Sequence, residues 1–389
     1  MRLMLYEWQG FMQRDIEYVL KKMNIEFRVF MYSFLSANDL EDSYFESIFS
    51  KALKEGRYEG VLSMNFWPVI AKCCYRLKIP YIAWIYDCPF IVGDKQAALS
   101  YLTNSIFMFD RKEYEKRKGE GFPVHHLCLG SNQERIDEIV ITGEEQKRYQ
   151  ADVSFVGQMY RVHFPAFCNG LTEYERGRLE SVLETQLRIY GAFELDSMIE
   201  GDLEQSLLGL PYLNSVKDSK KERMRLLLSK EITYRERFLL LYLLSMEHRV
   251  ALYSNREVPE LPKVMFRGTV DSYEEIHKVF RMSRINLNIT LKCIESGIPL
   301  RAMEILSAGG FLLSNYQTEL VENFRPDVDC VVYESVPDAI EKVRYYLAHE
   351  EERKEIAKNG HEASGRFTLQ KQMERILDVV YGSSEGRSS

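Results

Sequence analysis

The segment Ile285–Ser314, INLNITLKCIESGIPLRAMEILSAGGFLLS, indicates how this chain folds. Its pattern predicts a buried strand, a glycine-bearing loop, a helix that opens at Pro299, and a second apolar strand after Gly309 and Gly310. Proline suits the first helical position because its missing N–H would be unpaired there, and glycine suits the end of a helix. Strands that alternate with helices in this way predict a parallel α/β sheet.

The start of the same helix carries side chains that suit an anion. A helix that opens beside Gly297 presents backbone N–H groups at its positive end, where a phosphate can bind. Arg301 and Glu304 are three residues apart and therefore share one helix face. They offer a guanidinium for phosphate and a carboxylate for sugar hydroxyls. The same pair is also common as a surface ion pair, so the residues alone leave both interpretations open.

Length and composition narrow the class of protein. The chain has 389 residues, which favours two domains over one core, and its net charge of −7 argues against a general nucleic-acid binder. No apolar run is long enough to span a membrane, and MRLMLYEWQG does not resemble a secretion signal. Seven scattered cysteines suggest free thiols, so we expect a cytoplasmic protein. No zinc-like spacing occurs, and we expect neither a metal nor a cofactor.

The order of strands and helices predicts two tandem domains. Residues 1–132 alternate strand and helix, and the polar run 133–150 is interpreted as a linker. A second α/β domain is predicted over 151–364, with the strand Asp152–Val156 near its start. Both domains are expected to be doubly wound and Rossmann-like.

Three segments do not fit the simple alternation. The helix-rich stretch 171–246 is too long for a simple crossover, so we interpret it as a helical insertion that could also form a homodimer contact. A helix over 365–382 is expected to pack back on the N-terminal domain. The polar tail 383–389 is predicted to be disordered.

Two aspartates of the N-terminal domain are candidate catalytic groups. Asp87 follows the apolar strand Tyr81–Tyr86 and precedes Pro89, and Asp15 lies in the first strand–helix loop. In parallel sheets ligands gather at the carboxyl ends of the strands, and a carboxylate there can accept a proton. A turn explains Asp87 about as well, and helix capping explains Asp15.

Four segments resemble the CgeB-like group of bacterial GT-B glycosyltransferases, whose N-terminal half is the family known as DUF3880. They are YEWQGFMQRDIEYVLKKMNIEFRVF (Tyr6–Phe30), IPYIAWIYDCP (Ile79–Pro89), ADVSFVGQMY (Ala151–Tyr160) and SGIPLRAMEILSAGGFLLSNYQTELVENF (Ser296–Phe324). The last is the most specific. Taken together with the spacing of the four segments along the chain, the likeness covers nearly the whole chain apart from the helical stretch and the polar tail.

The resemblance implies a nucleotide diphosphate-sugar held by the C-terminal domain and an unknown acceptor bound by the N-terminal domain. Glu304 matches the glutamate that holds the donor ribose, and Gly297 with the helix start matches the diphosphate loop, beside Arg301. Gly157 matches the glycine of the opposing loop, and Lys292 is a further candidate for diphosphate charge. Such enzymes need no metal because the helix dipole and cations neutralise the leaving diphosphate.

Two departures from the family pattern matter. Many retaining enzymes of this type carry Glu-x7-Glu, but here Ser296 stands at the first position and Glu295 falls one residue early. Many also place a histidine where this chain has Tyr86 and Asp87. The stereochemical outcome is therefore not predicted.

The leading prediction is a metal-independent hexosyltransferase that uses a UDP-sugar in the cleft between its domains. The alternatives are a non-catalytic nucleotide-sugar sensor or assembly protein, and a GT-B sugar-nucleotide epimerase. A D-x-D pattern, Asp327–Asp329, is interpreted as a turn rather than a metal site.

Overall fold

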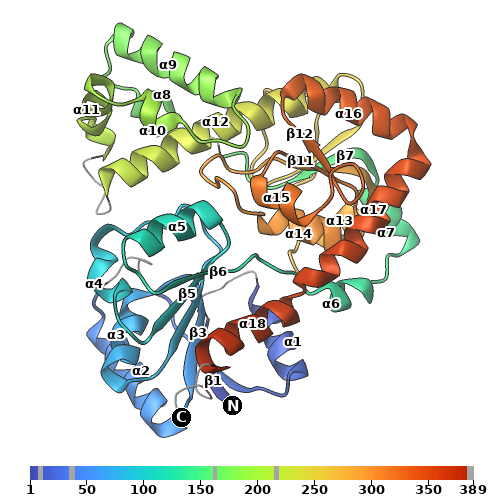
Figure 1. Cartoon of the computed structure of the whole chain (residues 1–389). Coiled ribbons are helices and arrows are strands. Elements are labelled where there is room, and N and C mark those ends of the chain that lie inside the picture. The colour runs from blue at the N-terminus through green and yellow to red at the C-terminus, as the bar shows by residue number, and fades with distance from the viewer. Residues whose placement is uncertain (8–11, 35–39, 161–163, 214–218, 383–389) are drawn as a thin grey trace. The chain divides into compact units, whose positions relative to one another are not determined.

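The computed structural model describes residues 1–7, 12–34, 40–160, 164–213 and 219–382. The chain divides into two compact units (Figure 1). The first unit combines Met1–Asn132 with the chain from Arg366 onward, and the second is Gln133–Gly365. The tail 383–389, for which disorder is predicted, lies outside the described residues.

The first unit is built on a parallel six-stranded sheet with the order β2-β1-β3-β4-β5-β6. Its strands are apolar because helices cover the sheet, as in β4, where every residue is buried. The elements are β1 (Arg2–Glu7), α1 (Gln13–Lys22), β2 (Glu26–Met31), α2 (Ser43–Gly56), β3 (Gly60–Met64), α3 (Pro68–Leu77), β4 (Tyr81–Trp84), α4 (Gln96–Leu99), β5 (Asn104–Met108), α5 (Arg111–Gly119) and β6 (Val124–His126).

The last helix, α18 (Leu369–Tyr381), packs against α1 within the first unit. The Leu369 N–H donates to the Ser131 carbonyl at 2.9 Å. Gly130 permits this approach, since a Cβ atom there would lie 2.4 Å from the Phe367 carbonyl oxygen. The Tyr381 hydroxyl donates to the Glu59 carbonyl at 3.2 Å.

The second unit holds another parallel six-stranded sheet, with the order β12-β11-β10-β7-β8-β9. The two sheets with their flanking helices confirm the predicted pair of doubly wound α/β domains. The elements are β7 (Ala151–Val156), β8 (Val250–Tyr253), β9 (Met265–Phe266), α13 (Ile276–Met282), β10 (Ser283–Asn288), α14 (Leu300–Ser307), β11 (Leu312–Asn315), α15 (Thr318–Asn323), β12 (Val331–Tyr333), α16 (Val336–Ala348) and α17 (Glu350–Ser364).

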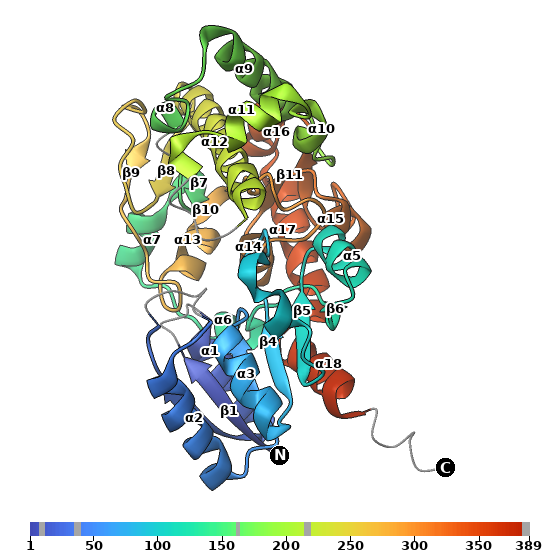
Figure 2. The same cartoon turned by 90° about the vertical axis from the view of Figure 1, so that its left-hand side faces the viewer.

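Between β7 and β8 most of the described residues are helical, and these helices gather beside the sheet of the second unit (Figure 2). They are α8 (Phe164–Phe167), α9 (Glu173–Leu187), α10 (Leu195–Met198), α11 (Asp202–Leu208) and α12 (Lys220–Ser245). They share an apolar core of their own that includes Leu179, Leu207 and Met224. The end of α12, with Leu240 and Leu244, packs instead into the core of the sheet. Helix α12 therefore connects the two cores.

The predicted linker 133–150 is wrong. This run forms α6 (Gln133–Asp137) and α7 (Gly143–Tyr149) and belongs to the second unit. Its charges serve local contacts: Thr142 and Glu145 form a capping box, and the Lys278 ammonium lies 2.5 Å from Glu145. Tyr149 is buried and donates its hydroxyl to Glu275 at 2.6 Å.

Candidate functional site

The start of α14 has the predicted arrangement, shifted by one residue. Pro299 is the capping residue, with φ −67° and ψ 150°, and Leu300 is the first helical residue. Glu304 is buried, and the Arg301 guanidinium donates to its Oε2 at 2.5 Å. The Arg301 side chain stays 31% exposed. The ion pair that was the other interpretation of Arg301 and Glu304 is therefore present. It is not a pair of two exposed side chains, because it joins a buried carboxylate to a cation that solvent can reach.

A second contact fixes the loop just before α14. Ser296 is buried, and its hydroxyl donates to Glu319 Oε1 at 2.9 Å, while the Glu319 N–H donates to the Ser296 carbonyl at 2.9 Å. Gly297, the next residue, is also buried. Ser296 therefore ties the candidate diphosphate loop to the first turn of α15. Glu319 was not predicted as a partner of this loop, because its only signal in the sequence is its place near a helix start.

Lys292 is held inside the protein. Its ammonium lies 2.9 Å from Glu236 Oε2 and 4.2 Å from the centre of the Tyr190 ring. Glu236, on α12, is fully buried and accepts the hydroxyls of Tyr190 and Tyr333 at 3.0 Å each. Burial and the Glu236 carboxylate raise the pKa of both tyrosines, so they stay protonated and donate. Sequence reasoning missed Glu236, because nothing in a helical pattern signals a buried carboxylate.

Gly157 follows β7 at the carboxyl edge of the sheet, and its N–H donates to the Tyr253 carbonyl at 3.0 Å. A Cβ atom there would lie 3.2 Å from the Phe155 ring. Arg237, also on α12, donates both to the Gln158 carbonyl and to the Ile289 carbonyl. The loops after β7 and β10 are therefore joined through one buried guanidinium.

Arg301 also contributes to an electropositive region beside α13. His277 is buried, and burial first, then the charges of Arg135, Arg301 and Arg281, lower its pKa to about 3. The imidazole is therefore neutral at physiological pH. Only Arg301 of these three lies at the start of α14, because Arg281 donates to the carbonyl of Ala308 at the other end of that helix, at 3.0 Å, and Arg135 donates to the Tyr273 carbonyl at 2.9 Å.

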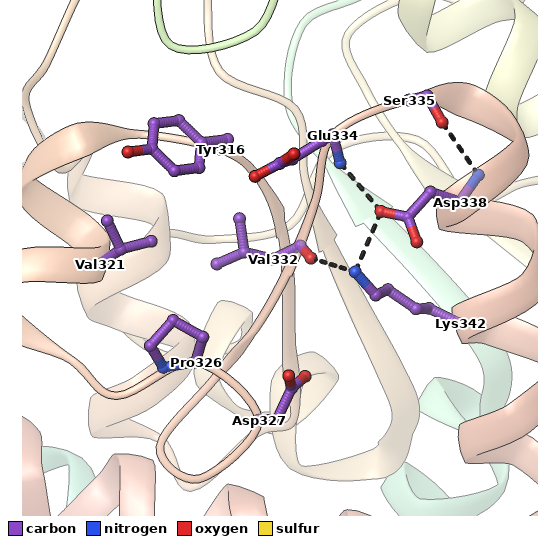
Figure 3. A pocket seen from close by; sticks show the side chains of 9 residues that line it. All are labelled: Tyr316, Val321, Pro326, Asp327, Val332, Glu334, Ser335, Asp338 and Lys342. Carbon is purple, nitrogen blue, oxygen red and sulfur yellow. Dashed lines mark hydrogen bonds and ion pairs between the residues drawn. The ribbon is translucent and has the colours of Figure 1, made fainter.

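A pocket of about 730 Å³ lies at the open edge of the second sheet (Figure 3). Lys342 donates to the Val332 carbonyl at 2.6 Å and to Asp338 at 2.9 Å, which covers the edge strand β12. Tyr316 and Glu334 line the pocket from the carboxyl ends of β11 and β12. They also line a second hollow of about 570 Å³. Both volumes lie in the range of small-molecule sites.

In the first unit, Asp87 is exposed after β4, at the carboxyl edge of the sheet. The Asn65 side chain donates to Asp87 Oδ2 at 2.7 Å and accepts from the Tyr86 N–H at 2.9 Å. Asn65 has φ +57°, a left-handed conformation that asparagine tolerates better than most residues. The carboxylate is thus held in place while it faces solvent.

Asp15 is placed differently. It lies within the first turn of α1, is buried, and accepts from the Asn132 side chain at 3.0 Å. The capping position is Met12, so the helix-capping explanation of Asp15 is wrong. Asp110 does cap a helix, since its Oδ1 accepts from the Glu113 N–H at 2.9 Å in α5.

The D-x-D pattern is a turn, as predicted. Asp327 has φ +58°, and its N–H donates to the Cys330 carbonyl at 2.8 Å. Asp329 is buried against Arg325, with a shortest ion-pair distance of 2.7 Å. The second carboxylate is therefore committed to the turn rather than to a metal.

Comparisons with known proteins bear on this arrangement. Residues 235–378 match a family described as glycosyl transferase-like. No curated protein matches the chain. The fold is similar to sucrose-phosphate synthase from Thermosynechococcus elongatus, with a TM-score of 0.58, 10% identity, and 98% and 100% of the two chains covered. The chain has the GT-B fold.

Two further GT-B structures are similar over nearly their whole length. A glycosyltransferase from Rickettsia africae has a TM-score of 0.56 and 9% identity, with 100% of this chain and 99% of that chain covered. The Anabaena protein HepE in complex with UDP-glucose has a TM-score of 0.56 and 8% identity, with 98% and 100% covered. The residues that match the glycosyl transferase-like family, 235–378, include α14. No helix in the described residues is long and apolar enough to cross a membrane.

Proposed function

We propose that this chain is a hexosyltransferase that uses a nucleotide diphosphate-sugar, with a UDP-sugar favoured. The observation that carries the proposal is the start of α14, where buried Glu304 holds the solvent-accessible Arg301 beside Gly297. A helix N-terminus with an adjacent guanidinium suits a diphosphate, and a carboxylate suits ribose hydroxyls. The glycosyl transferase-like match over this helix and the similarity to a UDP-glucose complex support it.

The proposed donor site uses the helix dipole and Arg301, rather than a metal, to neutralise the leaving diphosphate. Ser296 and Gly297 shape the loop, and Gly157 belongs to the opposing loop, where a Cβ atom would lie 3.2 Å from the Phe155 ring. We revise the role of Lys292, because its charge is already balanced by Glu236. Lys292 is proposed to support the loop and not to contact the phosphates directly.

Asp87 is the proposed catalytic carboxylate, which accepts or orients the proton of the acceptor hydroxyl. Its exposure and its bond to Asn65 favour it over Asp15, which is buried against Asn132. The acceptor is a hydroxyl compound of unknown class. We also place the chain in the CgeB-like group, on the segments that resemble it.

A nucleotide-sugar sensor is the second candidate. It is favoured by Ser296, which stands where many retaining enzymes carry a glutamate and which is bonded to Glu319. A sensor binds the donor, but it neither transfers the sugar to an acceptor nor hydrolyses the donor slowly.

Calorimetric titration of the full chain with UDP, GDP and other nucleoside diphosphates tests the donor assignment. We expect binding of at least one of them, with UDP first. Absence of binding to all of them by the folded chain would overturn the proposed function.

A further inference from the structure

One face of α12 is directed at the loop after β10. Residues at four-residue spacing lie on one side of a helix, and Arg225, Ser229, Thr233 and Arg237 follow that spacing, with Glu236 beside the last of them. Four of these side chains form hydrogen bonds or ion pairs with the segment 289–295. Arg225 contacts Glu295, Thr233 accepts the Lys292 N–H at 3.0 Å, Glu236 pairs with Lys292, and Arg237 donates to the Ile289 carbonyl.

These contacts are deep inside the protein. Thr233 and Glu236 are fully buried, and Arg237 and Lys292 are nearly so. A buried ion pair adds little net stability compared with apolar packing, but the loss of one partner leaves a costly uncompensated charge. The arrangement therefore selects one conformation of the loop more than it raises overall stability.

The same loop leads directly to the candidate donor residues. After the α12 contacts, Ser296 is tied to Glu319, and α14 begins at Leu300. The loop is thus held by α12 over residues 289–295 and by Glu319 at Ser296, and the helix that carries Arg301 and Glu304 follows directly. Contacts that hold the segment 289–295 therefore also restrain the chain that leads into the N-terminus of α14.

Another face of α12 has a different task. Arg235 pairs with Glu180 of α9 at 2.6 Å, and Met224, Leu228 and Ile232 pack in the core of the α8–α12 helices. Variants on the two faces of α12 can therefore be compared. Contacts on one face reach the segment 289–295, and the contacts named on the other face do not.

We infer that Glu236 and Thr233 are positioning residues, which hold the loop 289–295 and thereby set the start of α14 for the donor diphosphate. The inference rests on the proposed function. It assigns Lys292 to the same support, as the cation that links Glu236 to the loop. It also makes the fold of the α8–α12 helices a determinant of donor binding, through α12 and through Tyr190, which contacts both Lys292 and Glu236.

The test compares Glu236→Gln and Thr233→Val with the matched control Glu180→Gln, all in the full chain. Glu236→Gln removes the charge that balances Lys292, and Thr233→Val removes the acceptor of the Lys292 N–H while keeping the side-chain shape. Cys293, which is buried in the loop, reports loop opening through the rate of thiol labelling, resolved by peptide mass spectrometry.

We expect Cys293 labelling to accelerate at least about tenfold in both loop-facing variants, and UDP affinity to fall by about tenfold, which corresponds to about 1.4 kcal/mol. Glu180→Gln should change neither quantity. The double variant Glu236→Gln/Lys292→Met, which removes both charges of the Glu236–Lys292 pair together, should restore slow labelling in large part. Thr233→Val, which leaves every charge in place, keeps the test valid if Glu236→Gln alone fails to fold.

The outcomes separate the two proposals. Unchanged labelling and affinity in the folded variants of a nucleotide-binding wild type would overturn the positioning role only. Faster Cys293 labelling with unchanged UDP affinity would also overturn the positioning role, because the loop would then open more readily without any effect on nucleotide binding. A wild type that binds no nucleoside diphosphate would overturn the proposed function itself.

Discussion

At the scale of single residues, the proposed donor site depends on which groups pair with the carboxylate of Glu304. In the structure Glu304 and Arg301 bond to each other at 2.5 Å, and Glu304 is buried while Arg301 remains accessible. A bound nucleotide would place ribose hydroxyls at the carboxylate and phosphate oxygens at the guanidinium. Under the proposed function, the ion pair and the ligand site are therefore two states of the same two groups.

Glu304→Ala and Arg301→Ala should each weaken nucleotide binding by about 1–3 kcal/mol, because each removes a hydrogen bond to a charged group. Calorimetry of the folded variants with UDP measures the effect. Glu350→Gln, which breaks an exposed pair with Lys354 in α17, is the control and should bind normally. Unchanged affinity in both site variants would reduce the pair to a structural ion pair.

Asp87→Asn should reduce sugar transfer by about 10²-fold or more while nucleotide affinity barely changes, since it removes the charge and keeps an acceptor for Asn65. The matched control is Asp110→Asn, at the carboxyl end of β5, which caps α5 and should leave transfer intact. Initial rates with a saturating donor measure the effect. Undiminished transfer by Asp87→Asn would move the catalytic assignment to Asp15.

At the scale of elements, α13 contains a buried ionisable group outside the proposed chemistry. His277 has a folded pKa of about 3, below the ordinary value of 6.5, because burial and nearby arginines oppose its charging. As the pH falls below 6.5, the unfolded chain takes up this proton before the folded chain does. The stabilisation is thus complete above pH 6.5 and is lost progressively toward pH 3.

His277→Gln should therefore make the unfolding free energy less sensitive to acid. The wild type should lose about 2 kcal/mol more than the variant between pH 7 and pH 5, as an upper value for one histidine. Urea unfolding at the two pH values, followed by circular dichroism, compares them. Equal pH dependence of the two proteins would show that His277 takes up its proton in the folded state.

The elements were largely predictable, and the exceptions have physical causes. Continuous apolar strands that alternate with helices define both sheets, because a parallel sheet buries both of its faces. The prediction of a linker over 133–150 was wrong because its charged residues form a capping box and ion pairs instead of facing only solvent. Arg301 and Glu304 could be paired from their spacing, whereas the partner of Lys292 lies on α12, far away in sequence.

At the scale of the whole molecule, all the proposed donor residues lie in the second unit, Gln133–Gly365, which has its own core. That unit expressed alone should bind UDP with an affinity within about tenfold of that of the full chain, since tenfold is only about 1.4 kcal/mol. Calorimetry on both proteins makes the comparison. A folded second unit without binding, beside a full chain that binds, would show that the first unit supplies essential donor contacts.

The central claim, that the chain is a glycosyltransferase with its donor site at the start of α14, is tested most directly by donor turnover. The full chain is incubated with UDP-sugars and other nucleotide diphosphate-sugars, with and without a panel of hydroxyl acceptors, and the released nucleoside diphosphate is measured. We predict release from at least one donor, stimulated by an acceptor and greatly reduced in Glu304→Ala. Binding of a donor without any release across the panel, or release that Glu304→Ala leaves unchanged, would contradict the claim.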